Sequence, residues 1–259
     1  MTYLVVATRM ELFKLKRTLA LAVAVVVPLA LLGMLAANLL SRDPNQVLPS
    51  SPWDTFVVNF ALFLWCVLAL PLLVTLETAL LAGLEHGQKH WQDLFALPIP
   101  RWSLYGAKLL AGAGLLALSM LVLGLGLGLE GAMLNVLRPS FGLGGPIPWL
   151  DILRSMSVVF GATLLLLSLL TWVATRWPSF AVPSGVGITG TVIALILDIS
   201  SKADFWARMF PWSMPLSAVA PINDNRTLES HALALTLGIV GGLVVAVLGA
   251  WDITRRDVI

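Results

Sequence analysis

Three residues of one short polar stretch have the types that bind metal ions. Glu85, His86 and His90 lie close together, and the histidines, four positions apart, share one face of a helix. The zinc-protease motif has its glutamate between the two histidines, whereas here the glutamate precedes both. No third ligand is evident nearby. A zinc enzyme is therefore only an alternative, and we expect neither a metal site nor a catalytic residue.

Glycine and acidic residues in the apolar segments are the other candidates for chemistry. Gly185, Gly187 and Gly190 spell GxGxxG, but inside an apolar segment and not after a strand, so we expect them to let helices approach closely. The same interpretation covers Gly124, Gly126, Gly128, Gly238 and Gly242. Acids are costly inside a membrane, which makes Glu77 a possible functional acid and Asp198 a weaker one. No GxxxxGK[ST] nucleotide-binding motif occurs in the sequence.

Composition indicates which elements must position these residues. The 259 residues are 58% hydrophobic and 12% charged, whereas soluble domains are about 25% charged. The apolar runs are long and continuous, which indicates membrane helices and not a barrel. A net charge of +2 gives no reason to expect nucleic acid as a partner. Cys66, the single cysteine, lies in an apolar run and is expected to be a buried thiol.

The pattern predicts an all-α membrane protein, a single transmembrane domain over 1–259. Six runs are long enough to cross about 30 Å of hydrocarbon: 19–40, 56–82, 103–129, 151–174, 179–199 and 231–252. The first is too long for a signal peptide, so we expect a retained helix. Residues 203–221 are apolar, aromatic and interrupted by prolines, which predicts a broken or re-entrant element on the outer side.

Residues 1–18 are predicted to form an interfacial helix, with lipid as its partner. The positions expected to enter the interface are Tyr3–Val6, Met10, Leu12, Phe13 and Leu15. The positions expected to face water or lipid headgroups are Arg9, Glu11, Lys14, Lys16 and Arg17. This basic cluster precedes the first span, and the larger share of Lys and Arg lies on the same side, so both termini are predicted to be cytoplasmic.

The polar stretch between the second and third spans is the strongest functional signal. Over 84–98, apolar and polar residues alternate at helical spacing, and Leu97-Pro98-Ile99-Pro100 then stops the helix. An amphipathic helix of this kind, held on the cytoplasmic side, is typical of a docking element.

These residues resemble a known family. The run EHGQKHWQDLFALPIPRWSLYGAK, from Glu85 to Lys108, resembles the hallmark of ABC transporter permeases of the type-2 exporter class, like drug and bacteriocin exporters. The ending Asp252-Ile-Thr-Arg-Arg-Asp257 is similar to the basic, aspartate-bearing end of that class. His86 and His90 depart from the pattern, because many relatives have other polar residues there.

The resemblance implies a membrane subunit that pairs with a second permease, identical or homologous, above two ATP-binding subunits. ATP and Mg would be bound by those subunits, with no cofactor in this chain. The stretch 84–98 would be the coupling helix. Its contacts with the ATPase would be Glu85, His86, Lys89, Trp91, Gln92, Asp93 and Arg101. Arg176 and Trp177 would form a second cytoplasmic contact.

The function expected is ATP-driven export of an amphipathic or lipidic substrate, such as an antimicrobial peptide or drug, across a bacterial or archaeal plasma (inner) membrane. A stand-alone secondary transporter or channel is one alternative, and it requires acids at mid-membrane of which only Glu77 is a partial candidate. A subunit of the same architecture that senses or confers resistance without net transport is another.

Overall fold

The computed structural model describes residues 2–16, 18–43, 52–86, 100–177, 179–199, 204–219 and 228–255. Every regular element in these ranges is a helix. In chain order they are α1 Thr2–Leu15, α2 Leu19–Leu40, α3 Pro52–Asp54, η1 Thr55–Leu62, η2 Trp65–Ala69, α4 Leu70–His86, α6 Arg101–Leu137, η3 Pro139–Phe141, α7 Trp149–Arg176, α8 Ala181–Ile199, α9 Asp204–Met209, α10 Met214–Ser217, α11 Leu228–Thr236, η4 Leu237–Gly241 and α12 Gly242–Thr254.

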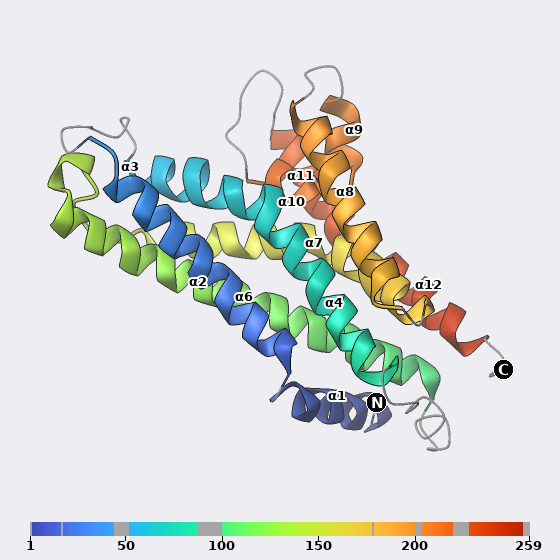
Figure 1. Ribbon diagram of the computed structural model, residues 1–259. Coiled ribbons are helices and arrows are strands. Elements are labelled where there is room, and N and C mark those ends of the chain that lie inside the picture. The colour runs from blue at the N-terminus through green and yellow to red at the C-terminus, as the bar shows by residue number, and fades with distance from the viewer. Residues whose placement is uncertain are drawn as a thin grey trace.

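Six stretches of helix in the described ranges are long and apolar enough to cross a membrane, which confirms the predicted all-α membrane fold. They are Leu19–Leu40, Pro52–Gly83, Arg101–Leu137, Trp149–Arg176, Ala181–Asp198 and His231–Thr254. Figure 1 shows α2, α4 and α6 running alongside one another. The helix α7 contacts α4, α6, α8 and α12, so it is the central helix of the bundle.

The third span is the longest helix and extends well beyond the predicted end at residue 129. It begins after Pro100, whose carbonyl accepts hydrogen bonds from both the amide and the hydroxyl of Ser103, at 2.9 and 2.6 Å. It ends at Leu137, just before Pro139. There the guanidinium of Arg138 donates to the carbonyl of Leu40 at 2.6 Å, which joins the ends of α6 and α2.

The second span is not a uniform α-helix. Its first half contains two π-helical segments, η1 and η2, before α4 continues the span. A π-segment widens the turn, occurs mostly as a single-turn bulge within an α-helix and is frequent at functional sites. Such a segment leaves no trace in hydropathy, so the sequence predicted only a span over 56–82.

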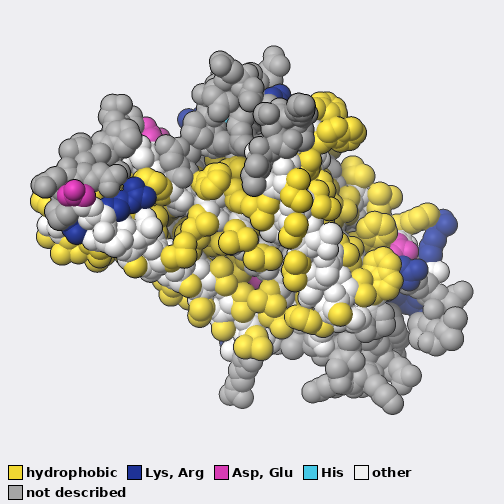
Figure 2. Space-filling view, turned by 45° about the horizontal axis from the view of Figure 1, so that its top comes forward, with side chains coloured by type: hydrophobic (Ala, Val, Ile, Leu, Met, Phe, Trp, Pro, Cys, Tyr) yellow, Lys and Arg dark blue, Asp and Glu magenta, His cyan; other side chains and the backbone are white. Residues whose placement is uncertain are grey.

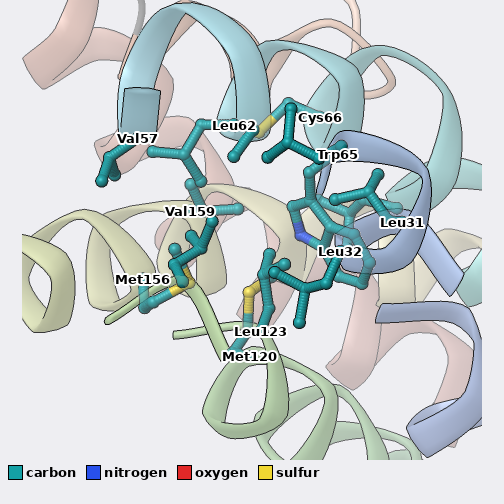
Figure 3. Packing of buried hydrophobic residues seen from close by; sticks show 14 of the residues in the cluster. Leu31, Leu32, Val57, Leu62, Trp65, Cys66, Met120, Leu123, Met156 and Val159 are labelled. Carbon is teal, nitrogen blue, oxygen red and sulfur yellow. The ribbon is translucent and has the colours of Figure 1, made fainter. Parts of the chain in front are cut away.

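A core of large apolar side chains joins the first four spans. Trp65 of η2 is fully buried and points toward Leu31 and Leu32 of α2, while Leu62 lies near Val159 of α7 (Figure 3). Cys66 is also fully buried, as expected for a structural thiol. Apolar burial does not drive association between helices in lipid, so close packing of this kind must supply the cohesion.

Several of the glycines singled out in the sequence lie where helices touch. A Cβ at Gly238 would be 2.5 Å from the Cα of Ala162 in α7, and one at Gly242 would be 2.9 Å from the carbonyl carbon of Leu164. In α8, Gly187 is covered by Thr75 of α4 and Gly190 by the indole of Trp212. The predicted role in close helix packing is therefore seen directly, although Gly185 of the same GxGxxG has open space around it.

The segment 204–219 contains two short helices, α9 and α10, connected by a turn. The side chains of α9 are largely exposed, with Phe205 and Trp206 in edge-to-face contact. In contrast, residues from Trp212 to Ser217 are buried, and α10 packs against α7, α11 and η2. Half of this segment thus lies on the surface and half enters the bundle.

Candidate functional site

The sequence-predicted coupling residues lie at the gap between α4 and α6. Lys89, Trp91, Gln92 and Asp93 fall within residues 87–99, outside the described residues, as does His90. The backbone of 84–86 belongs to the last turn of α4, so the second span's helix continues through His86. Arg101 is the first residue of α6. The structure therefore fixes the two helices that flank the predicted coupling element.

A buried ion pair holds these two flanking helices to α1. The ammonium of Lys108 in α6 lies 3.8 Å from a carboxylate oxygen of Glu11 in α1 and donates to the carbonyl of Leu81 in α4 at 3.3 Å. Both charged side chains are about 5% exposed or less. Lys14 donates to the other carboxylate oxygen of Glu11 at 3.0 Å. Three elements that are distant in sequence thus meet at one charged junction.

The position of Glu11 corrects the prediction that it faces water or lipid headgroups, because its side chain is buried. Ala7, Glu11 and Leu15 follow one another at helical spacing and form the buried side of α1. This side packs against α6, where a Cβ at Gly106 would lie 3.1 Å from the side chain of Leu4. Leu15 therefore packs against protein and not in the membrane interface, and Glu11 is stabilised by two lysines instead of by water.

Arg176 and Trp177, the predicted second contact, lie at the end of α7. Both are exposed, and the guanidinium of Arg176 lies 5.8 Å from the centroid of the indole ring of Trp177. The amide of Trp177 closes the last turn by donating to the carbonyl of Val173 at 3.2 Å. The exposed indole is thus at the end of the central helix of the bundle.

A second interhelical bond links α7 to α12 near the same end. The indole N–H of Trp172 donates to a carboxylate oxygen of Asp252 at 2.9 Å. Next to it, the guanidinium of Arg255 stacks over Trp251, 4.0 Å from the ring centroid. Nothing in the sequence indicated this bond, because Trp172 and Asp252 are 80 positions apart and a contact between residues so distant has no local signal.

Glu77 lies at a place where three spans meet. It is fully buried in α4, and Ser119 of α6 lies beside its carboxyl group. The hydroxyl of Ser119 donates to the carbonyl of Ala24 in α2 at 2.8 Å. Among the described residues, neither carboxyl oxygen of Glu77 has a hydrogen-bond partner. Burial of such a group without partners is unfavourable even when the group is neutral, and this cost makes Glu77 a candidate functional residue.

Glu130 is a second buried acid, which the sequence analysis missed. It is buried in α6, and its carboxyl oxygens also lack hydrogen-bond partners among the described residues. It was missed because the third span was predicted to end at residue 129. The described part of the chain contains no group of three His, Cys, Asp or Glu side chains placed to hold a metal ion.

An apolar cavity of about 340 Å³ opens between α6 and α7. Its lining includes Met120, Gly124, Trp149, Ile152 and Met156, and Ser157 is its polar member. Figure 2 shows one face of the molecule, on which apolar side chains form a broad band and the charged ones lie mostly toward the ends. Such a surface suits a hydrocarbon environment.

The comparisons with known proteins identify the class. A family model described as ABC-2 family transporter protein matches residues 7–194, which is most of the chain and includes the second half of α1, the charged junction, the first four spans and most of the fifth. The chain belongs to this family. It is thus a multi-pass membrane protein of the ABC-2 permease type, and membership of this family implies a partnership with ATP-binding subunits. A search of the curated proteins and one of the solved structures gave no match.

Proposed function

We propose that the chain forms the translocation path of an ATP-driven exporter of amphipathic or lipidic molecules, such as an antimicrobial peptide or drug. The observation that carries this proposal is the family match over 7–194. The apolar cavity and the apolar face between the charged ends support a substrate with an apolar part. The sequence has no Walker A motif, so we assign ATP and Mg to separate subunits and no catalytic residue to this chain.

The assembly proposed is two permease chains, identical or homologous, with two ATP-binding subunits, in a bacterial or archaeal plasma membrane. We place both termini in the cytoplasm because the basic residues of α1 and the ends of α7 and α12 lie on one side of the six spans. The segment 203–221 is then on the outer side.

Coupling to ATP hydrolysis is proposed at the segment between α4 and α6. Its contacts with the ATP-binding subunit are Glu85, His86, Lys89, Trp91, Gln92, Asp93 and Arg101, with Arg176 and Trp177 as a second, smaller contact. Closure of the ATP-binding subunits would push this segment, and α4 and α6 would move as rigid bodies. The junction of Lys108 with Glu11 and Leu81 supports this mechanism, because it joins both helices to α1.

The test is co-purification of the chain, expressed with its native gene neighbours, with an ATP-binding subunit. The variant Trp91→Ala, Gln92→Ala, Asp93→Ala should lose that subunit, since the aromatic and charged side chains most able to anchor an interface are removed. The matched control is Arg154→Ala, Trp206→Ala, which changes two exposed residues at the opposite end and should retain it.

Two results would contradict the proposal. One is a native chain that purifies alone and moves a solute into liposomes without ATP, which would indicate a secondary transporter or channel. The other is retention of the ATP-binding subunit by both variants, which would place the contact elsewhere while leaving the family assignment intact.

A further inference from the structure

The helix α1 has two unlike sides, and within the described ranges its main packing against the bundle is made by one of them. Ala7, Glu11 and Leu15 face α6 and are buried. The opposite side is exposed and is here named the basic face. It consists of Val5, Val6, Arg9, Leu12, Phe13 and Lys16.

The basic face carries no negative charge. Glu11 is the only acid of α1, and it is withdrawn into the junction with Lys108 and Lys14, where its side chain is 5% exposed. Arg9 and Lys16 are exposed, so the charge that α1 presents to its surroundings is positive. An ordinary amphipathic helix of the same composition would present Glu11 beside its cations and be closer to neutral.

The two cations are held close to an apolar surface. The guanidinium of Arg9 lies 5.6 Å and the ammonium of Lys16 5.0 Å from the ring centroid of Phe13. Phe13 is itself about half exposed, and Val5, Val6 and Leu12 flank the charges with further exposed apolar surface. Cations above an apolar layer match the arrangement of anionic headgroups above acyl chains.

We propose that the basic face of α1 binds anionic phospholipid headgroups and prefers them to zwitterionic ones. Charge complementarity favours this occupant, since the face has cations and no accessible acid. The exposed apolar side chains on both flanks favour a lipid surface over an acidic protein surface, because a protein partner would have to bury them as well. This selectivity goes beyond the transport function and does not depend on which substrate is moved.

The test is the lipid composition retained by the purified chain. The detergent-solubilised chain is equilibrated with an equimolar mixture of phosphatidylglycerol and phosphatidylcholine, and the bound lipids are counted by native mass spectrometry. One cation near an anionic surface contributes about a fivefold change in affinity. Arg9→Gln and Lys16→Gln should therefore each lower the bound ratio of anionic to zwitterionic lipid about fivefold, and the double variant about 25-fold.

The matched control is Arg42→Gln, Arg154→Gln, which removes the same charge from the opposite end of the bundle and leaves α1 intact. It should change the bound ratio of anionic to zwitterionic lipid by less than about twofold, whereas 0.5 M salt should lower the ratio bound by the native chain. An unchanged ratio in the double variant, or an equal fall in the control, would overturn the proposal. Loss of a co-purifying ATP-binding subunit without a change in lipid ratio would also overturn it, because the face would then dock a protein.

Discussion

At the scale of single residues, the buried ionisable side chains fall into two classes, those with an ion-pair partner and those without a hydrogen-bond partner among the described residues. Glu11 and Lys108 are both buried, but each has an opposite charge nearby and Lys108 also donates to a backbone carbonyl. Glu77 and Glu130 are buried with no hydrogen-bond partner among the described residues. Removing one member of a buried pair leaves a charge uncompensated, whereas removing a buried group without partners removes only a desolvation cost. The two classes should therefore respond to mutation with opposite sign.

Lys108→Met should destabilise the chain by about 3 kcal/mol. It leaves the carboxylate of Glu11 buried, with the partly exposed Lys14 as its remaining ion-pair partner among the described residues. The double variant Glu11→Leu, Lys108→Met should regain most of the loss, because an apolar pair of similar volume replaces the ions. Thermal unfolding in one detergent measures both. If Lys108→Met alone is as stable as the native chain, the junction contributes nothing to the stability of the fold.

Glu77→Leu should stabilise the chain by about 1–3 kcal/mol, since it removes a buried polar group that lacks partners. The same unfolding assay applies, with Leu73→Met, a volume-conserving change at a buried position of the same helix, as the neutral control. If stability rises while transport falls, the acid is retained for function at a cost in stability. A lower unfolding midpoint would instead show that the carboxyl group is stabilised where it lies.

At the scale of elements, glycines set how closely two helices can pack. The sequence shows where glycines occur, whereas the structure shows which of them contact another helix. The sequence correctly predicted that glycines in the apolar runs permit close approach. It did not distinguish those in contact from those without, because the partner helix is unknown from the sequence alone. Gly238 touches the backbone of α7, whereas Gly185 faces open space, although both lie in apolar helices.

Gly238→Ala should destabilise the chain by about 2 kcal/mol or more, since the added Cβ would lie 2.5 Å from the Cα of Ala162 and backbone must move to admit it. Gly185→Ala is the matched control and should be neutral or stabilising by up to about 1 kcal/mol, because alanine favours the helix and nothing lies within 4 Å. Equal unfolding midpoints for the two variants would mean that η4 and α7 are not packed as described.

At the scale of the whole molecule, the sequence predicted the number of membrane spans but not the contacts between them. Long apolar runs predicted six spans because a membrane helix must be apolar along its length. The junction at Lys108 was not predicted, since Glu11 and Lys108 are far apart in sequence and each alone looks like an interfacial charge. The end of α6 was missed because the buried Glu130 interrupts the apolar run. The coupling residues stay a prediction.

The arrangement of the six spans leads to a prediction about sidedness. The native chain should not react with a maleimide, because Cys66 is fully buried. Any labelling of a cysteine variant can therefore be assigned to the introduced cysteine. Trp177→Cys, at the end of α7, should react with a membrane-impermeant maleimide only after cells are opened. Phe205→Cys, in α9 beyond the next span, should react in intact cells, because one span separates the two exposed positions. Labelling of Trp177→Cys but not of Phe205→Cys in intact cells would contradict the proposed topology. It would place α1 and the predicted ATPase contacts on the outer side of the membrane, where an ATP-binding subunit would have no access to ATP.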